Sequence, residues 1–181
     1  TAPPTSAPPA GALRAANAFV NLTFTQPTYL THAGDGSNRL FVTEKQGVIR
    51  VFDNRADVAS AAVFVDLRSR VDSSTDDAGL LGLTFDPAFR SNGHVYISWV
   101  TLAPTRKVRV SRFTVSAGNR NALDVASERV VYEYDHARDW HYGGWLAFGR
   151  DGMLYLSTGD NIRDAALQDV SSPYGKVLRM R

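Results

Sequence analysis

The segment 135–144, which reads DHARDWHYGG, holds the side chain best suited to catalysis. His141 stands three residues before Gly144, where an apolar strand is expected to begin. A neutral imidazole, with an ordinary pKa of about 6.5, can accept a proton from a bound hydroxyl at neutral pH. The glycines Gly143 and Gly144 allow a tight turn and the close approach of a flat ligand. His141 is therefore a candidate general base, and the alternative is a histidine that only ties the loop down by hydrogen bonds.

Carboxylates at two further places are candidates for a site. Asp77 precedes one apolar strand much as His141 precedes another, so it is expected to face a substrate, unless its stretch is only a polar turn. Asp160 and Asp164 lie in a long loop, 158–174, where they either bind an ion or a sugar hydroxyl or face solvent. The stretch VDSSTDDAG around Asp77 lacks the glycine and the final glutamate of an EF-hand, which excludes that calcium site.

Other patterns exclude several classes of site. His136 is expected to be a solvated loop residue, and a zinc pair with His141 has no third ligand at a standard spacing. The chain has no serine-nucleophile motif, phosphate loop or dinucleotide fingerprint. The absence of cysteine excludes disulfides, zinc–thiolate sites and cysteine nucleophiles. A cluster of cations alternates with valines and is expected to be a solvated strand face; it comprises Arg106, Lys107, Arg109 and Arg112.

Composition limits the class of protein. The chain has 181 residues, 44% of them apolar, with a net charge of +2, which suits one ordinary core and gives no reason to expect a nucleic-acid partner. No stretch approaches the roughly 18 consecutive apolar residues that span a membrane. Residues 1–16, rich in proline and alanine, are expected to be a linker or tail. Such a linker often follows a removed signal peptide, so a secreted or periplasmic location is expected.

One layout of strands repeats three times along the chain. Each repeat has an apolar strand, a glycine-containing turn and a second apolar strand, with turns at 34–38, 92–93 and 151–152. Leu40 and Val95, at matching places in the first two repeats, are 55 residues apart, and Leu154 follows after 59 more. Further strands follow in each repeat, and a short helix is hinted at around Ala165–Leu167. Four-stranded units at this spacing are typical of the blades of a β-propeller.

The sequence therefore predicts an all-β chain with about three of the blades of a larger propeller. The expected blades cover approximately 27–66, 80–134 and 143–181, the last of them incomplete, and 17–24 is a possible closing strand. Because three blades cannot close a ring, residues 17–181 look like the N-terminal half of a propeller. The alternative is a β-sandwich, which also has short strands and frequent turns.

Propeller topology predicts which loops meet at the mouth of the central channel. The loops that enter each inner strand and the loops that join second to third strands lie at the same end of every blade. The entering loops are 25–28, 68–79 and 135–144, and the others are 44–46, 101–106 and 158–174. His141 and Asp77 are thus expected at one shared face.

At these residues the chain resembles the glucose/sorbosone dehydrogenase family, whose members are six-bladed propellers. The segments that carry the resemblance are NRLFVTEKQGVIRVFD, AGLLGLTFDPAFRSNGHVYISWV, VSRFTV, HYGGWLAFGRDGMLYLSTGDN and GKVLRM, in family order across about 17–181. They match only the N-terminal half of the family domain. A propeller of this kind also occurs in Hedgehog-interacting protein, which is a binder and not an oxidoreductase.

The resemblance implies oxidation of an aldose hemiacetal to a lactone by hydride transfer to pyrroloquinoline quinone (PQQ), with electrons passing on to an external acceptor. The family's catalytic base falls on His141. The implied cofactor contacts in this chain are Gly143, Gly144, Asp160 and Asn161. Most cofactor contacts and the calcium ligands of the family lie in the other half, so no metal ligand is expected here. A complementary C-terminal half, or a second copy of the chain, is the expected partner.

The chain departs from the family pattern at two substrate positions. Glucose-oxidising members have a glutamine where this chain has Asp77 or Ala78, and some have an aspartate where it has Trp140. Asp77 and Trp140 are therefore the candidate substrate contacts, and the sugar itself stays open. Two other functions remain possible from the residues: a non-catalytic propeller that binds carbohydrate or protein, and a calcium-dependent lactonase.

Overall fold

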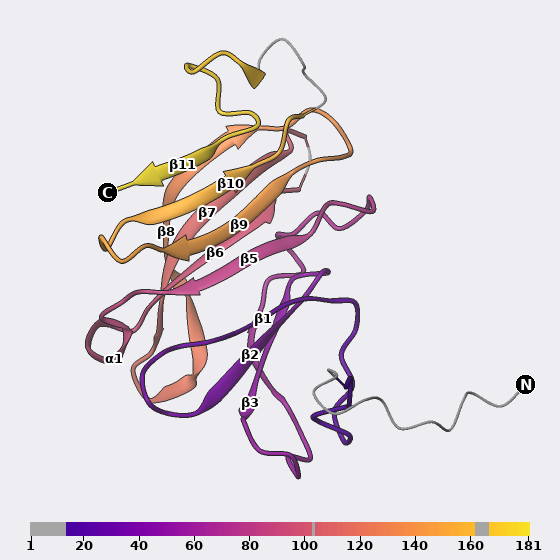
Figure 1. Cartoon of the computed structure of the whole chain (residues 1–181), viewed down its shortest axis with the longest axis vertical. Coiled ribbons are helices and arrows are strands. Elements are labelled where there is room, and N and C mark those ends of the chain that lie inside the picture. Colours follow the sequence, from indigo (N-terminus) through magenta and orange to yellow (C-terminus); the bar gives the residue numbers. More distant parts are fainter. Residues whose placement is uncertain (1–13, 103, 162–166) are drawn as a thin grey trace, which may run out of the picture.

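The computed structural model describes residues 14–102, 104–161 and 167–181, and it consists of antiparallel sheets that follow one another along the chain (Figure 1). The first sheet contains β1 (Pro27–His32), β2 (Arg39–Glu44), β3 (Val48–Asp53) and β4 (Ala62–Asp66). The second contains β5 (Leu80–Phe85), β6 (His94–Val100), β7 (Lys107–Ser116) and β8 (Asn119–Asp135), with a short helix α1 (Phe89–Asn92) between β5 and β6. The third contains β9 (Gly143–Phe148), β10 (Leu154–Thr158) and β11 (Val177–Met180).

The expected all-β class and the meandering order of strands are confirmed. In each sheet neighbours in sequence are neighbours in space, which is the arrangement of a propeller blade. β8 runs for 17 residues, and β7 pairs with it over most of its length. The helix hinted at around 165–167 falls largely outside the described residues.

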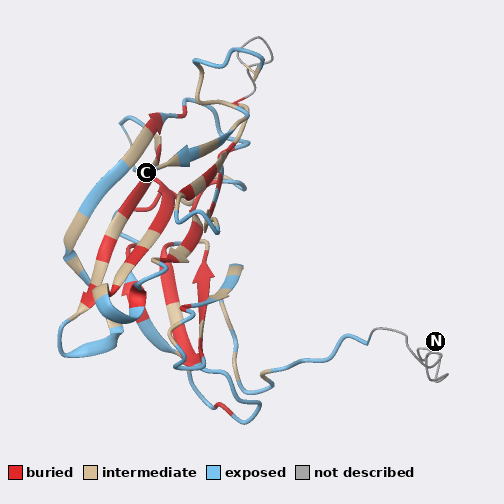
Figure 2. Ribbon diagram, turned by 60° about the vertical axis from the view of Figure 1, so that its left-hand side comes forward, coloured by how far each residue is buried: buried red, intermediate tan, exposed pale blue. Residues whose placement is uncertain are grey.

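The sheets pack face to face, and apolar side chains fill the space between them. Between the first and second sheets the fully buried side chains include Phe41, Phe64, Leu83, Ile97 and Trp99. Between the second and third sheets they include Val100, Val108, Val110, Leu146 and Leu156. Burial is accordingly concentrated along the middle of the strands and falls off at the loops (Figure 2). Successive sheets packed on one another, and not two sheets alone, exclude the β-sandwich alternative.

The first strands of the sheets lie next to one another, since β1 contacts β5 and β5 contacts β9 (Figure 1). Small residues make the close approach of β5 and β9 possible. A Cβ on Gly82 would overlap the Gly144 carbonyl, and a Cβ on Gly144 would meet the Leu81 side chain at 2.5 Å. The Ser98 hydroxyl also donates to the Gly144 carbonyl. The inner strands β5 and β9 of the second and third sheets thus pack closely against each other, directly beside the loop that carries His141.

The segment 17–24, a possible closing strand of a blade outside this chain, is not paired in the described structure. Its backbone is irregular, and no strand of the described chain runs beside it to supply the hydrogen-bonded ladder that a strand needs. The apolar side chains of Phe19 and Phe24 instead pack on Phe52, on the outer face of the first sheet, at ring-centroid distances of 5.0 and 5.7 Å.

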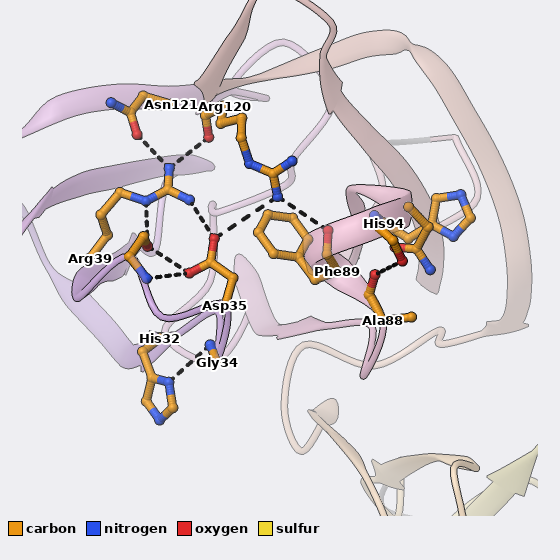
Figure 3. Close-up of polar contacts among 12 residues, drawn as sticks. His32, Gly34, Asp35, Arg39, Ala88, Phe89, His94, Arg120 and Asn121 are labelled. Atoms are coloured by element: carbon orange, nitrogen blue, oxygen red, sulfur yellow. Dashed lines mark hydrogen bonds and ion pairs between the residues drawn. The ribbon is translucent and has the colours of Figure 1, made fainter.

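A buried ion-pair cluster ties the first sheet to the second at the end opposite His141 (Figure 3). Arg39 Nη2 donates to Asp35 Oδ2 at 3.0 Å, and Arg39 Nη1 donates to the Arg120 carbonyl at 2.8 Å and to the Asn121 side chain. Arg120 in turn donates to the Phe89 carbonyl at 3.2 Å. Burial acts to raise the pKa of Asp35, but hydrogen bonds from Ser37 and Arg39 outweigh it and lower that pKa below its usual value.

We expect Arg39→Met to destabilise the chain by about 1–3 kcal/mol, because it removes the arginine donor from the buried Asp35 side chain and from the Arg120 carbonyl and leaves Asp35 with its Ser37 donors alone. Arg55→Met is the matched control, since the Arg55–Asp57 pair is exposed and worth at most about 0.5 kcal/mol. Urea unfolding measures both. Because the pKa of Asp35 is lowered by folding, the difference between wild type and Arg39→Met should shrink as the pH falls through the acid range. Equal losses in the two variants would show that the cluster contributes no more than a surface pair.

Candidate functional site

The loops that were expected at one end of the sheets do meet there. Lys45, in the loop between β2 and β3, accepts a hydrogen bond from the Leu80 amide at 2.9 Å and donates to the Gln26 carbonyl at 3.0 Å. Arg106, in the loop between β6 and β7, forms ion pairs with Asp72 and Asp139 from two entering loops. These contacts connect loops of all three sheets at a single face.

His141 lies at this face, and three contacts hold it. Its backbone amide donates to Asp77 Oδ2 at 2.9 Å, its ring Nδ1 lies 2.7 Å from Asp160 Oδ1, and its carbonyl lies 3.2 Å from His136 Nε2. Its backbone φ is 64°, in the left-handed region that non-glycine residues seldom occupy. The side chain is 56% exposed. The loop is therefore held in an uncommon conformation that keeps the imidazole open to solvent.

The His141–Asp160 pair determines which ring nitrogen can act as a base. An ionised carboxylate only accepts hydrogen bonds, so Asp160 favours the tautomer with the proton on Nδ1. This leaves the lone pair on Nε2, for which the described residues supply no hydrogen-bond partner. A base oriented by a carboxylate on its other nitrogen is the arrangement that general-base catalysis uses.

Gly159 makes room for the backbone of His141. Its amide donates to the Tyr142 carbonyl at 3.1 Å, and a Cβ at this position would overlap the His141 carbonyl oxygen and carbon. No other residue type fits here without moving the loop. Sequence reasoning did not single out Gly159; the close pairing of Thr158 with Gly143 across β9 and β10 is what brings it under His141.

The prediction that His136 is a solvated loop residue is wrong. Its relative exposure is 0%, although the chain on either side of it is exposed. Its ring stacks on the buried ring of Tyr142 with centroids 4.2 Å apart, and Tyr134 and Tyr174 lie further out at 6.4 Å each. Four aromatic rings from β8, the His141 loop and the segment before β11 thus form a small core beneath the site.

Both predicted substrate contacts are neighbours of His141, one in the chain and one through a hydrogen bond. Trp140 precedes it and is 51% exposed, so its ring is available to a ligand. Asp77 uses Oδ2 to accept the His141 amide, and the described residues make no hydrogen bond to its Oδ1. The stretch before Asp77 contains a polar turn, in which Asp72 accepts hydrogen bonds from the Ser74 amide and hydroxyl.

The four candidate cofactor contacts differ in their surroundings. Gly143 and Gly144 both have positive φ, and a Cβ on Gly143 would meet Gly159 at 2.5 Å, so internal packing already explains why both are glycine. Asp160 is the partner of His141. Asn161 is fully buried with φ of 51°, and neither its Nδ2 nor its Oδ1 has a hydrogen-bond partner among the described residues. An amide that is buried without partners among the described residues is unusual in a folded protein.

Charge at this face is largely neutralised internally. Arg106 donates to Asp72 Oδ2 at 2.6 Å and also pairs with Asp139. The cations expected on a strand face are likewise paired, Lys107 and Arg109 with Glu133. Within residues 14–102, 104–161 and 167–181 no group of three His, Cys, Asp or Glu side chains is placed to hold a metal ion. In the same ranges no helix is long and apolar enough to cross a membrane.

Comparison with known proteins gives consistent results. Residues 24–181 match the family described as Glucose / Sorbosone dehydrogenase. Hedgehog-interacting protein from Mus musculus is 35% identical over 169 residues, which cover 86% of this chain and 24% of that protein. The HIPL2 protein of Arabidopsis thaliana is 26% identical, over 81% of this chain and 28% of that protein.

Solved structures agree on the fold. A structure from Thermus thermophilus described as a putative oxidoreductase (glucose dehydrogenase) superposes with a TM-score of 0.72 and 31% identity, covering 87% of this chain and 44% of that one. The PQQ-bound aldose sugar dehydrogenase from Streptomyces coelicolor superposes with a TM-score of 0.74 and 26% identity, covering 90% and 46%. The chain thus spans less than half the length of these structures and about a quarter of the curated relatives. The predicted propeller fold, in part of its length, is confirmed.

Proposed function

The chain belongs to the glucose/sorbosone dehydrogenase family, and from that premise we propose that it is part of a PQQ-dependent dehydrogenase that oxidises an aldose hemiacetal to a lactone. The observation that carries this proposal is the His141–Asp160 pair, 2.7 Å apart, with Nε2 of an exposed imidazole turned away from it. It stands at the face where loops of successive sheets meet, which is where a propeller binds its ligands.

The residues at this face fit one part of a PQQ site. PQQ is a flat quinone that carries carboxylates, and the amide of Asn161, for which the described residues supply no hydrogen-bond partner, is a donor of the kind its carbonyls accept. Carboxylates call for cations, and Arg106, which lies at this face, is already paired with Asp72 and Asp139. The described residues therefore suit the reacting edge of the group, and we propose that its carboxylates and the calcium ion are held by the remainder of the propeller.

In the proposed reaction, Nε2 of His141 takes the proton of the anomeric hydroxyl. Asp160 stabilises the imidazolium that forms, because its carboxylate already accepts the Nδ1–H. PQQ, when bound, supplies the acceptor for the hydride that leaves the anomeric carbon. Loss of the proton and the hydride makes that carbon a carbonyl, and the product is the lactone. The exposed ring of Trp140 is proposed to pack against the sugar, with Asp77 Oδ1 accepting from one of its hydroxyls.

The experiment that tests this function uses the full-length protein. With PQQ and calcium added, we expect aldoses to reduce an artificial electron acceptor and a lactone to form, with no reduction when PQQ is left out. Hydrolysis of lactones with calcium and no quinone would support the lactonase function instead. An absence of both activities in PQQ-loaded protein would overturn the enzymatic proposal.

A non-catalytic function is the second candidate, and one observation favours it. Hedgehog-interacting protein is 35% identical over 86% of this chain, as close as the 31% of the structure described as a glucose dehydrogenase. In that case the chain is part of a propeller that binds a protein or a carbohydrate, and binding should be unaffected by His141→Gln.

For either function, the Pro/Ala-rich start supports a secreted or periplasmic location, which a signal peptide in the precursor would test.

We further propose that another part of a propeller, a complementary half, covers the open face of the third sheet and pairs with its edge strand β11. Trp145, Ser157 and Val177 form one row across β9, β10 and β11, and Trp145 and Val177 are 48% and 69% exposed. Leu146, Leu156 and Leu178 form the opposite row, which packs on the second sheet. Coverage of only 44–46% of the similar structures supports this proposal.

Hydrogen exchange tests which partner covers this face. We expect the amides of β11 to exchange rapidly in the 181-residue chain and slowly in the full-length protein, because an edge strand gains a neighbour there. Light scattering should show the 181-residue chain as a monomer of about 20 kDa, consistent with its 19.8 kDa mass. A stable dimer would mean that a second copy covers the face, and equal exchange in both proteins would mean that nothing does.

A further inference from the structure

His136 is a buried ring with a hydrogen-bond acceptor at each of its nitrogens. Nδ1 lies 3.2 Å from the Arg138 carbonyl, and Nε2 lies 3.2 Å from the His141 carbonyl. Its backbone amide donates to the Arg106 carbonyl at 3.0 Å, and this hydrogen bond fixes the position of the His136 backbone that carries the ring. The exposed loop 137–141 is thus closed around a ring that touches it at two places.

A neutral imidazole cannot satisfy both carbonyls. Carbonyl oxygens only accept hydrogen bonds, and a neutral imidazole has a single N–H. One of the two contacts is therefore a hydrogen bond, and in the other the nitrogen lone pair faces the lone pairs of a carbonyl oxygen. Burial lowers the pKa of His136, against hydrogen bonds to His141 and Arg138 and the charge of Asp160, which act to raise it. The ring is therefore neutral at neutral pH and must take one of two tautomers. Because folding lowers the pKa of His136, the contribution of the neutral ring to stability is fully present above about pH 6.5 and is lost as the pH falls.

The surroundings of the ring favour no other partner. The rings of Tyr134, Tyr142 and Tyr174 pack around it, and the Tyr134 hydroxyl already donates to the Tyr142 carbonyl at 2.9 Å. Among the described charged groups, the carboxylate of Asp160 acts on the ring through its charge, the side chain of Arg106 is paired with Asp72 and Asp139, and Asp135 and Arg138 are exposed. The choice of tautomer therefore rests on the two carbonyls.

We propose that His136 is a positioning residue for the reaction proposed above, and that its Nε2–H tautomer binds the His141 carbonyl and so holds the His141 imidazole against Asp160. The inference rests on the proposed function for its catalytic meaning. Its structural content is separate: without this hydrogen bond the left-handed backbone of His141 loses the contact at its carbonyl and keeps the Asp77 contact at its amide. The ring then has more freedom to leave Asp160.

Three variants separate the two nitrogens. The amide nitrogen of glutamine reaches the place of Nε2, that of asparagine reaches the place of Nδ1, and phenylalanine keeps the stack on Tyr142 without either donor. In the full-length, PQQ-loaded protein we expect His136→Gln to keep kcat within about 3-fold of wild type. We expect His136→Asn and His136→Phe to lower kcat by about 10- to 100-fold with little change in KM, as for a displaced reacting group.

A second readout does not depend on activity. In NMR spectra the proton on Nδ1 of His141 and its slowly exchanging backbone amide report the contacts with Asp160 and Asp77. Both signals should persist in His136→Gln and weaken in His136→Asn, two variants of similar polarity, so that failure of the phenylalanine variant to fold would not matter. Unchanged signals in His136→Asn would overturn the positioning role, even if the wild type oxidises sugars. If the wild type oxidises none, the proposed function fails while these signals still decide the role of His136.

Discussion

The full-length protein carrying His141→Gln is expected to lose about 10²- to 10⁴-fold in kcat for aldose oxidation, the usual contribution of a positioned general base. Glutamine keeps a polar side chain of similar reach, but it cannot take the proton of the anomeric hydroxyl. Steady-state reduction of an artificial acceptor measures the loss. Titration with PQQ should show unchanged cofactor affinity, because the change removes a proton acceptor and leaves the fold intact.

His94→Gln is the matched control for His141→Gln. His94 begins β6 at the opposite end of the second sheet, where it lies 3.8 Å from Asp86, and its replacement should leave kcat unchanged. The kcat of Asp160→Asn should lie between those of His141→Gln and His94→Gln. An amide does not stabilise the imidazolium as a carboxylate does, and it can favour the wrong tautomer of His141. Full activity in His141→Gln would mean that another group accepts the proton, and the assignment of the base would be wrong.

Gly159→Ala is expected to lower both stability and activity. The added Cβ would overlap the His141 carbonyl and come within 3.0 Å of the Tyr142 carbonyl carbon, and both are backbone atoms that cannot rotate away. Overpacking of this kind costs about 1–3 kcal/mol of unfolding free energy. Displacing the His141 backbone should also lower kcat by about 100-fold, since small misplacements of reacting groups are that costly. Urea unfolding and acceptor reduction measure the two effects.

Gly118→Ala supplies the comparison for Gly159→Ala. Gly118 lies in the turn between β7 and β8, and a Cβ there would meet nothing within 4 Å. Its replacement should change neither stability nor rate. If Gly159→Ala unfolds at the same urea concentration as Gly118→Ala, the loop before β9 has enough freedom to move aside, and the tight hold on His141 inferred from the structure would be wrong.

Several features of the fold were predictable because they depend on local pattern. Alternating apolar residues and glycine turns indicated short strands in repeated antiparallel units, which the sheets of the structure contain. The loop contacts of His141 with Asp77 and Asp160, 64 and 19 residues away, also followed in outline, because an up-and-down order of strands puts these loops at one end. The strand over 17–24 could not be judged in this way, since a strand exists only with a neighbour beside it.

The sequence by itself determined the type of sheet, the order of the strands and the identity of His141 as the candidate base. Only the tertiary structure decided what holds that base: the carboxylate of Asp160 at Nδ1, the absence of a side chain at Gly159, and the burial of His136 among tyrosines from three segments. The physical reason is the range of the forces involved. Strand patterns arise between residues a few positions apart, whereas burial and hydrogen-bond partners depend on segments that meet only when the sheets pack together.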